Sequence, residues 1–118
     1  MKTLVWTDTA LQDYHQNIEY LLQKWSEKEA INFISDVESV LFGLMDEKVE
    51  YKESGYRNIR QCVVCKQITL YYRHKGSNEI ELLRFWNNHK DTEKLNLSVL
   101  LSHASKEDAR KKTLKHSH

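Results

Sequence analysis

Apolar residues recur every three or four positions in two long stretches of the first half of the chain. This spacing places them on one face of a helix, so the pattern predicts two amphipathic helices. The apolar face of the first is made of Leu11, Tyr14, Ile18, Leu21 and Trp25. That of the second is made of Ala30, Phe33, Ile34, Val37, Leu41 and Leu44. Neither face is stable in water alone, so we expect an antiparallel helical hairpin that packs on a sheet.

Residues that cap helix N-termini stand at the start of each predicted helix. Thr7, Asp8 or Thr9 precedes the first apolar stripe. Ser26 precedes the second, with Glu29 three residues further on. Side-chain oxygens at such positions accept hydrogen bonds from the first backbone N–H groups of a helix. The boundary between the two helices is therefore expected close to Ser26.

Four segments are rich in β-branched and aromatic residues and predict β-strands. They cover residues 4–7, 56–65, 68–72 and 80–86. Gly76 and Asn78 tolerate the backbone angles of a tight turn, so the last two strands are expected to form a hairpin. The order β-α-α-β-β-β predicts an α+β fold, in which the N-terminal helical hairpin packs on a small antiparallel sheet.

The end of the chain differs in composition from the rest. An apolar run at residues 99–101 predicts the close of a short third helix that begins near Thr92. Residues 103–118 carry five Lys and Arg against two Asp and Glu, and they have no apolar period. We therefore expect one domain over residues 1–102, followed by a basic, flexible tail.

Charge is distributed unevenly along the 118 residues, although the net charge is only +1. Residues 1–53 carry 5 Lys and Arg against 11 Asp and Glu, whereas residues 57–90 carry 7 against 2. A basic half favours a polyanionic partner, but a protein held by phosphate contacts alone is usually more basic. No apolar run approaches the roughly 20 residues of a membrane span. With no signal-like start either, we expect a cytoplasmic protein that has no membrane partner.

Cys62 and Cys65 have the two-residue spacing of redox and zinc pairs. On a strand, positions three apart point to opposite faces, so the two sulfur atoms would not converge. The sequence holds no second cysteine pair. We therefore expect buried thiols, with no metal and no cofactor.

Four arginines lie on the last three predicted strands, and they are Arg57, Arg60, Arg73 and Arg84. Guanidinium groups bind phosphates or carboxylates through paired hydrogen bonds, so a cluster of them suits RNA or an acidic peptide. The alternative is that they pair with Glu79, Glu81 or carboxylates of the helices. Strict alternation gives Arg84 the same face as Leu82, and a bulge near Leu82 and Leu83 would turn it outward.

Two further positions are candidates for contact with a substrate or partner. Tyr71 and Tyr72 are neighbours, so one is expected in the core and the other exposed, where it would stack on a base or cover a peptide. His89, between Asn88 and Lys90, is the best candidate for a general acid or base, since imidazole exchanges protons near neutral pH. The alternative is an exposed histidine without a function.

The bend WSEKEAINF between the helices and the ending YYRHKGSNEIELLRFWNNHKDTEKL resemble the RelE/ParE superfamily of toxins. These toxins belong to bacterial type II toxin–antitoxin pairs. The resemblance covers about residues 3–96 and rests on the order of elements and the pattern of this ending. It implies a compact β-α-α-β-β-β fold that an antitoxin segment wraps and neutralises. Some members cleave mRNA on the ribosome, and others poison DNA gyrase without nuclease chemistry.

Along the strands, this sequence matches the ribonuclease members of the superfamily only in part. Their basic residues on the first strand of the meander correspond to Arg57 and Arg60. Their arginine on the central strand has no direct equivalent, because Gln67 or Thr69 holds that position and Arg73 lies later.

The match at the end of the chain is also partial. The basic residue of the ribonuclease members corresponds to Lys90 or His89. A tyrosine or histidine follows it in those members, whereas Leu95 stands there in this chain. Acid–base strand scission needs both a proton acceptor and a proton donor, so Leu95 weighs against ribonuclease action. It does not affect antitoxin binding.

We therefore expect the growth-inhibiting toxin of a type II toxin–antitoxin module, bound by its antitoxin through the exposed face of the sheet and the helical hairpin. The alternatives are a ribosome-dependent mRNA endoribonuclease, a DNA gyrase-directed poison, and an inert binding module. The expected catalytic residues of a ribonuclease are His89, Lys90, Arg60 and Arg73. The expected substrate-binding residues are Arg57, Arg84, Tyr71 and Asn88.

Overall fold

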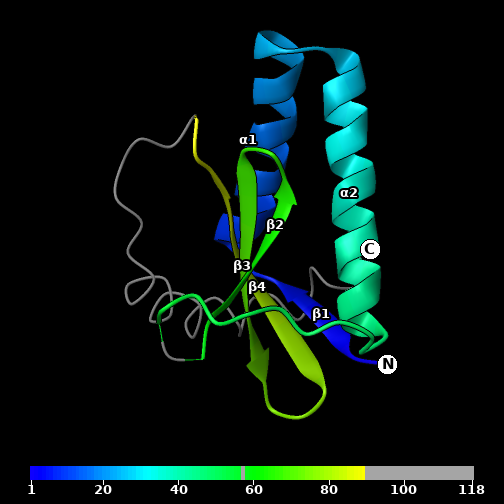
Figure 1. Ribbon diagram of the computed structural model, residues 1–118, viewed down its shortest axis with the longest axis vertical. Helices are drawn as coiled ribbons and strands as arrows, with labels where there is room; N and C mark the ends of the chain where they lie inside the picture. The colour runs from blue at the N-terminus through cyan, green and yellow to red at the C-terminus, as the bar shows by residue number, and fades with distance from the viewer. Residues whose placement is uncertain (57, 90–118) are drawn as a thin grey trace.

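The computed structural model describes residues 1–56 and 58–89 of the chain. Its helices and strands follow the predicted order (Figure 1). They are β1 (Thr3–Trp6), α1 (Asp8–Lys24), α2 (Glu27–Met45), β2 (Arg60–Cys65), β3 (Ile68–Lys75) and β4 (Glu79–Asn87). Arg57, Lys90, the expected third helix and the expected tail over residues 103–118 lie outside the described residues.

The helical hairpin is confirmed, and each of its helices begins at a predicted cap. Thr7 Oγ1 accepts a hydrogen bond of 3.0 Å from the N–H of Ala10. Ser26 Oγ accepts one of 3.2 Å from the N–H of Glu29. The two helices lie side by side in opposite directions (Figure 1), because only Trp25 and Ser26 separate them. In the described part of the chain, no helix is long and apolar enough to cross a membrane.

The four strands form one mixed sheet in the order β1-β4-β3-β2. β2, β3 and β4 form the predicted antiparallel meander. β1 joins it parallel to β4, from Thr3 opposite Glu79 to Trp6 opposite Leu82. The α+β layout is thus confirmed, and the sheet differs from the antiparallel one that we expected at this single pair of strands. Alternation along a strand predicts that the strand pairs, but its partner and direction depend on residues far away in the sequence.

β2 begins four residues later than predicted. Gly55 and Asn58 have positive φ angles of 107° and 68°, which do not occur in a continuous strand. The chain turns back on itself there, and the N–H of Ser54 donates a hydrogen bond of 2.9 Å to the carbonyl oxygen of Ile59. The predicted turn between β3 and β4 is confirmed, with Gly76 at a φ of 66°.

The core lies between the helices and one face of the sheet, and an aromatic cluster joins the two layers. The ring of Tyr14 lies 5.3 Å from that of Trp6 and 5.7 Å from that of Phe33. The ring of Phe85 stacks on Trp6 with 5.6 Å between the centroids. Trp25, which we expected on the same apolar stripe, is exposed. It is the C-cap of α1, so its backbone has already left the helical path.

A β-bulge in β4 confirms the expected irregularity of that strand. Leu82 lies opposite Tyr72 of β3, whereas Arg84 lies opposite Tyr71, only one residue earlier. The residue between Leu82 and Arg84 is therefore the extra one of the bulge. Beyond it the alternation of β4 is reversed, so Phe85 joins the core in place of Arg84. Tyr72 is fully buried and Tyr71 is half-buried, as expected for neighbours on opposite faces.

Candidate functional site

Two side chains of α1 take the place of a strand beside the end of β4. β1 pairs with β4 only as far as Leu82. Further along, Asp13 Oδ2 accepts a hydrogen bond of 3.1 Å from the N–H of Phe85, and Asn17 Nδ2 donates one of 3.0 Å to its carbonyl oxygen. Asn87 Nδ2 donates another, of 2.9 Å, to Asn17 Oδ1. Because buried backbone groups need partners, these bonds set the position of α1 along β4.

Asp13 also binds Arg84. Arg84 donates from Nε and Nη2 to the two carboxylate oxygens, at 2.6 and 3.0 Å. Its guanidinium carbon lies 5.0 Å from the ring centroid of Trp86. Of the two roles considered for this arginine, the structure shows the ion pair. A bidentate pair uses the same donors that a phosphate would need.

Arg73 and Arg60 also lie beside acidic side chains. Arg73 Nε donates to Oε1 of the fully buried Glu81 at 2.5 Å, across the pair of β3 and β4. Arg60 Nη1 donates to the carbonyl oxygen of Tyr51 at 2.7 Å, and its Nε lies 3.6 Å from Glu50 Oε1. A polyanion would therefore compete with an acid at each strand arginine that the structure describes.

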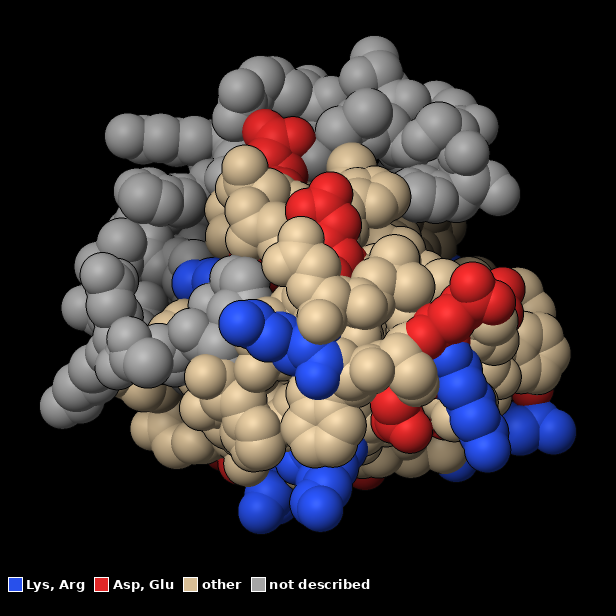
Figure 2. Space-filling model, turned by 90° about the horizontal axis from the view of Figure 1, so that it is seen from above, with Lys and Arg blue, Asp and Glu red and all other residues tan. Residues whose placement is uncertain are grey.

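On the molecular face in Figure 2, basic and acidic side chains are also intermingled. Lysine and arginine side chains are dispersed over it, and several lie beside Asp or Glu, with uncharged surface between them. On this face, the described residues form no single broad basic patch of the kind expected for a surface that binds a polyanion.

His89 is exposed beyond the end of β4, far along the sheet from Arg73. The partner of Asn87 on β3 is Ile68, which lies five residues before Arg73. At about 3.4 Å per residue, the two positions on β3 are roughly 17 Å apart. The structure thus places Asn88 and His89 together at one end of the sheet and does not bring them to the arginine. Their proposed catalytic and substrate-binding roles stay predictions.

Cys62 and Cys65 are both free thiols, the first buried and the second half-buried. Burial raises the pKa of each thiol above its ordinary value. Within the residues that the structure describes, no three His, Cys, Asp or Glu side chains are grouped so as to hold a metal ion. A protonated thiol is a weak nucleophile and a poor ligand, so the pair contributes to packing.

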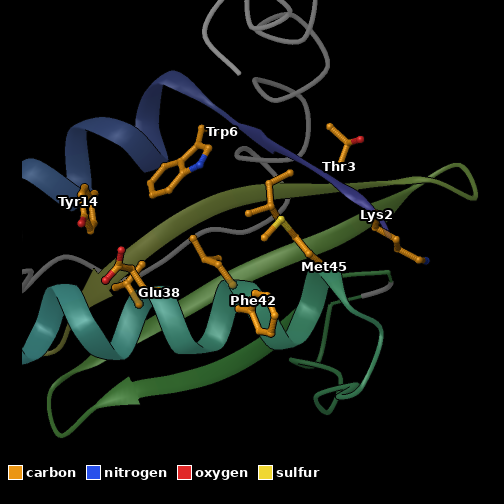
Figure 3. A pocket seen from close by; sticks show the side chains of 10 residues that line it. Lys2, Thr3, Trp6, Tyr14, Glu38, Phe42 and Met45 are labelled. Atoms are coloured by element: carbon orange, nitrogen blue, oxygen red, sulfur yellow. The ribbon is translucent and has the colours of Figure 1, made fainter. Parts of the chain in front are cut away.

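An open groove of about 760 Å³ lies between β1, α1 and α2 (Figure 3). Its walls are largely apolar, with Leu4 and Trp6 from β1 and Leu41, Phe42 and Met45 from α2. Phe42 leaves more than half of its surface exposed in this groove. Large exposed apolar surfaces are uncommon on proteins that act alone, so the groove is a candidate binding site.

The groove follows an edge of the sheet. β1 is the outermost strand and pairs with β4 on one side. The N–H groups of Thr3 and Thr7 donate toward that side, to the carbonyl oxygens of Asn78 and Leu82. Because backbone groups alternate between the two sides of a strand, those of Leu4 point to the open side. A second chain segment therefore has both backbone groups and an apolar surface to bind.

Lys2 lies at one end of the groove (Figure 3) and belongs to a cluster of ionisable side chains that the sequence did not predict. His74 Nε2 lies 2.6 Å from Glu50 Oε1, and His74 Nδ1 lies 3.4 Å from Lys2 Nζ. The hydrogen bond with His74 is the main reason why the pKa of Glu50 is lowered. One feature of the sequence could have indicated this cluster. His74 follows Tyr72 by two residues, so it lies on the same, core-facing side of β3. A histidine there needs polar partners.

The loop that carries Glu50 is tied to the sheet beside this cluster. The N–H of Tyr51 donates a hydrogen bond of 3.1 Å to Tyr72 Oη. The N–H of Gln61 donates one of 3.0 Å to the carbonyl oxygen of Lys52. Burial raises the pKa of Tyr51 to about 12, so this phenol is neutral at physiological pH. These contacts hold Glu50 over the end of β3.

Solved structures share this arrangement of helices and strands. One, from a chromosomal ParDE toxin–antitoxin system of P. aeruginosa, has a TM-score of 0.61 and 20% sequence identity, covering 74% of this chain and 96% of that chain. The fold is RelE/ParE-like. A copper-bound mutant toxin from Helicobacter pylori has a TM-score of 0.55 and 18% identity, covering 76% of this chain and 98% of that chain. No protein-family model and no curated protein matches the sequence.

Proposed function

We propose that this protein is the toxin of a type II toxin–antitoxin module. It inhibits growth in the cytoplasm when it is free, and a cognate antitoxin neutralises it. The fold, which it shares with a chain of a ParDE toxin–antitoxin system, supports this function. The apolar groove beside β1 is the observation that carries the proposal, because an exposed surface of this kind fits a segment of another protein.

The antitoxin segment lies in the groove in this proposal. An extended segment beside β1 gains main-chain hydrogen bonds from the open side of Leu4, and it buries apolar side chains against Phe42 and Met45. The burial contributes about 25 cal/mol for each Å² of apolar surface removed from water. One wall of the groove is formed by the helical hairpin, which is one of the two surfaces where we expected the antitoxin to bind.

Two matched substitutions on α2 test this binding mode. Phe42 is 58% exposed and lines the groove, whereas Ile31 is 57% exposed and does not. Both Phe42→Glu and Ile31→Glu are therefore expected to fold. Losing a buried phenylalanine costs about 1.5–3 kcal/mol, so Phe42→Glu is expected to weaken antitoxin binding by about ten-fold to a hundred-fold. Ile31→Glu is expected to bind as the unsubstituted protein does.

The measurement is growth after induced expression, with and without the product of the neighbouring reading frame. Expression alone is expected to arrest growth, and the neighbour is expected to relieve the arrest for the unsubstituted protein and Ile31→Glu only. Absence of arrest by the unsubstituted protein would overturn the toxin function. If the neighbour relieves the growth arrest equally for Phe42→Glu and Ile31→Glu, the antitoxin binds to another surface.

Two activities are candidates for the free toxin, since the resemblance implies both. A ribosome-dependent endoribonuclease produces new 5′ ends in mRNA, and these ends are mapped after expression. A DNA gyrase-directed poison leaves mRNA intact and causes cleaved plasmid DNA to accumulate. The two readouts, taken from the same culture, assign the target.

A further inference from the structure

Part of the sheet is buried on its outer face, which is the face turned away from the helices. Trp6 of β1 and Leu82 of β4 lie opposite each other and point to the core. Val5 and Glu81, one residue earlier on each strand, therefore point to the outer face. They are only 5% and 0% exposed, and Leu83, which is 2% exposed, also lies outside the core cluster. A sheet face open to water would leave such side chains exposed, so this part of the face is covered.

The cover belongs to this chain and lies outside its described part. The exposed fractions are those of a single chain, so its own residues bury these side chains. Both described helices pack on the core side, and every described strand belongs to the sheet itself. Residues 90–118 are the long segment that is left to supply the cover.

The chain leaves the path of β4 at the end of that strand. Asn87 Oδ1 accepts a hydrogen bond of 2.8 Å from the N–H of His89, which is the bond of a local turn. Four residues separate Asn87 from Thr92, where the predicted third helix begins. Consecutive elements joined by so short a connection usually lie side by side in opposite directions. The predicted helix is therefore expected to run back along the sheet.

The predicted helix has an apolar face for this contact. Leu97, Leu100 and Leu101 are spaced by three and four residues, so they share one side of a helix. Left in water, three neighbouring leucines would form an exposed apolar patch. An apolar surface on the sheet and an apolar stripe on the next segment of the chain thus match.

The length of the segment also fits. At 1.5 Å per residue, a helix over residues 92–102 is about 16 Å long. Leu83 lies four residues before the end of β4, which is about 14 Å at 3.4 Å per residue. Glu81 lies six residues before it, at roughly 20 Å. The helix therefore spans Leu83 and ends close enough to Glu81 for a leucine side chain to reach it.

We propose that residues 92–102 form a helix that covers Val5, Glu81 and Leu83 on the outer face of the sheet. The contact removes apolar surface from water on both sides. It also shields the ion pair of Glu81 with Arg73, whose side chain is 18% exposed. The cover closes this part of the outer face to other partners, so the groove on the core side of β1 is left for the antitoxin.

Two matched cysteine variants of the full-length protein test the cover. Val5→Cys and Val63→Cys make the same change on the outer face, but Val5 is 5% exposed and Val63 is 69% exposed. Alkylation by iodoacetamide is followed at each position by peptide mass spectrometry. Val5→Cys is expected to react at least about ten-fold more slowly than Val63→Cys, because a buried thiol is shielded and protonated.

Leu100→Glu removes part of the apolar contact. Added to Val5→Cys, it is expected to raise the alkylation rate at least about ten-fold, whereas the rate of Val63→Cys is expected to stay unchanged. Ile31→Glu, at an exposed position on α2, is the control and is expected to change neither rate. The native Cys62 is 3% exposed on the core-facing side of β2, so its slow alkylation shows that a variant is folded.

A cross-link decides the case in which Leu100→Glu unfolds the chain and Cys62 becomes reactive. The double variant Val5→Cys with Leu100→Cys is treated with a short bis-maleimide, in a mixture of unlabelled and isotope-labelled protein. A cross-link within one chain is expected. Val63→Cys with Leu100→Cys is the control, and it is expected to form none.

Three outcomes would overturn this inference. Equal alkylation of Val5→Cys and Val63→Cys would show that the face is open. A cross-link only between labelled and unlabelled chains would assign the cover to a second copy. A Val5→Cys that stays protected in folded Leu100→Glu, or that forms no cross-link, would assign the cover to another segment. These measurements do not depend on growth arrest, so this inference and the toxin function can fail separately.

Discussion

The contacts between α1 and β4 predict a large loss of stability when the carboxylate of Asp13 is removed. In Asp13→Ala, Arg84 loses both hydrogen bonds to the carboxylate, and the N–H of Phe85 loses its acceptor. The side chain of Asp13 is only 8% exposed and that of Arg84 is 20% exposed. Water therefore replaces the lost bonds only in part.

The size of the effect follows from this burial. Removing one partner of a buried ion pair costs about 3–5 kcal/mol, because the other charge stays buried. Because Arg84 is partly exposed, the cost of Asp13→Ala is expected near the lower end of this range, at about 3 kcal/mol. At about 4 °C per kcal/mol for a domain of this size, the melting temperature is expected to fall by roughly 12 °C.

Urea and thermal unfolding, followed by circular dichroism, measure this loss. Glu19→Ala changes an exposed residue of the same helix, so it controls for helix propensity and is expected to stay within about 0.5 kcal/mol of the unsubstituted protein. In an Arg84→Met background, Asp13→Ala is expected to lower the free energy of unfolding by at least about 1 kcal/mol less, because the buried positive charge is absent. A loss below about 1 kcal/mol in Asp13→Ala, or the same loss in both backgrounds, would refute the reasoning.

Three other predictions concern a tyrosine pair, a thiol and the end of the chain. Tyr72→Phe removes the acceptor of the Tyr51 N–H and is expected to lower the free energy of unfolding by about 1–2 kcal/mol. An unchanged urea midpoint would contradict this. Cys62, whose pKa burial raises, is expected to react with iodoacetamide more slowly than free cysteine at pH 8, and equal rates would argue against burial. Since its folded-state pKa lies above the ordinary 9.0, the free energy of unfolding is expected to fall as the pH rises from that value toward the folded-state pKa. Removing residues 103–118 is expected to leave the melting temperature unchanged, because they have no apolar period, and a large decrease would place them in the domain.

The helices and the meander were predictable because their signals are local. The stripes of apolar residues, the caps at Thr7 and Ser26 and the turn at Gly76 each act within a few residues of the chain. The bulge in β4 was also predictable, since without it Arg84 would have entered the core.

The candidate sites were less predictable, because the partners of polar side chains come from distant segments. Asp13 is separated by 71 residues from Arg84, and Glu50 by 24 from His74. A sequence pattern indicates that an arginine or a histidine has to be satisfied, but it does not identify the group that satisfies it. For this reason the strand arginines were open to two interpretations, and the cluster around His74 was missed.

The sequence by itself determined which segments are helices and strands and which of their faces are apolar, because backbone propensity and the burial of apolar side chains act through neighbouring residues. The tertiary structure alone decided that β1 runs parallel to β4, that Asp13 and Glu81 hold two of the arginines, and that an open groove lies beside β1. Those features depend on charges, backbone groups and surfaces that meet only when the chain has folded.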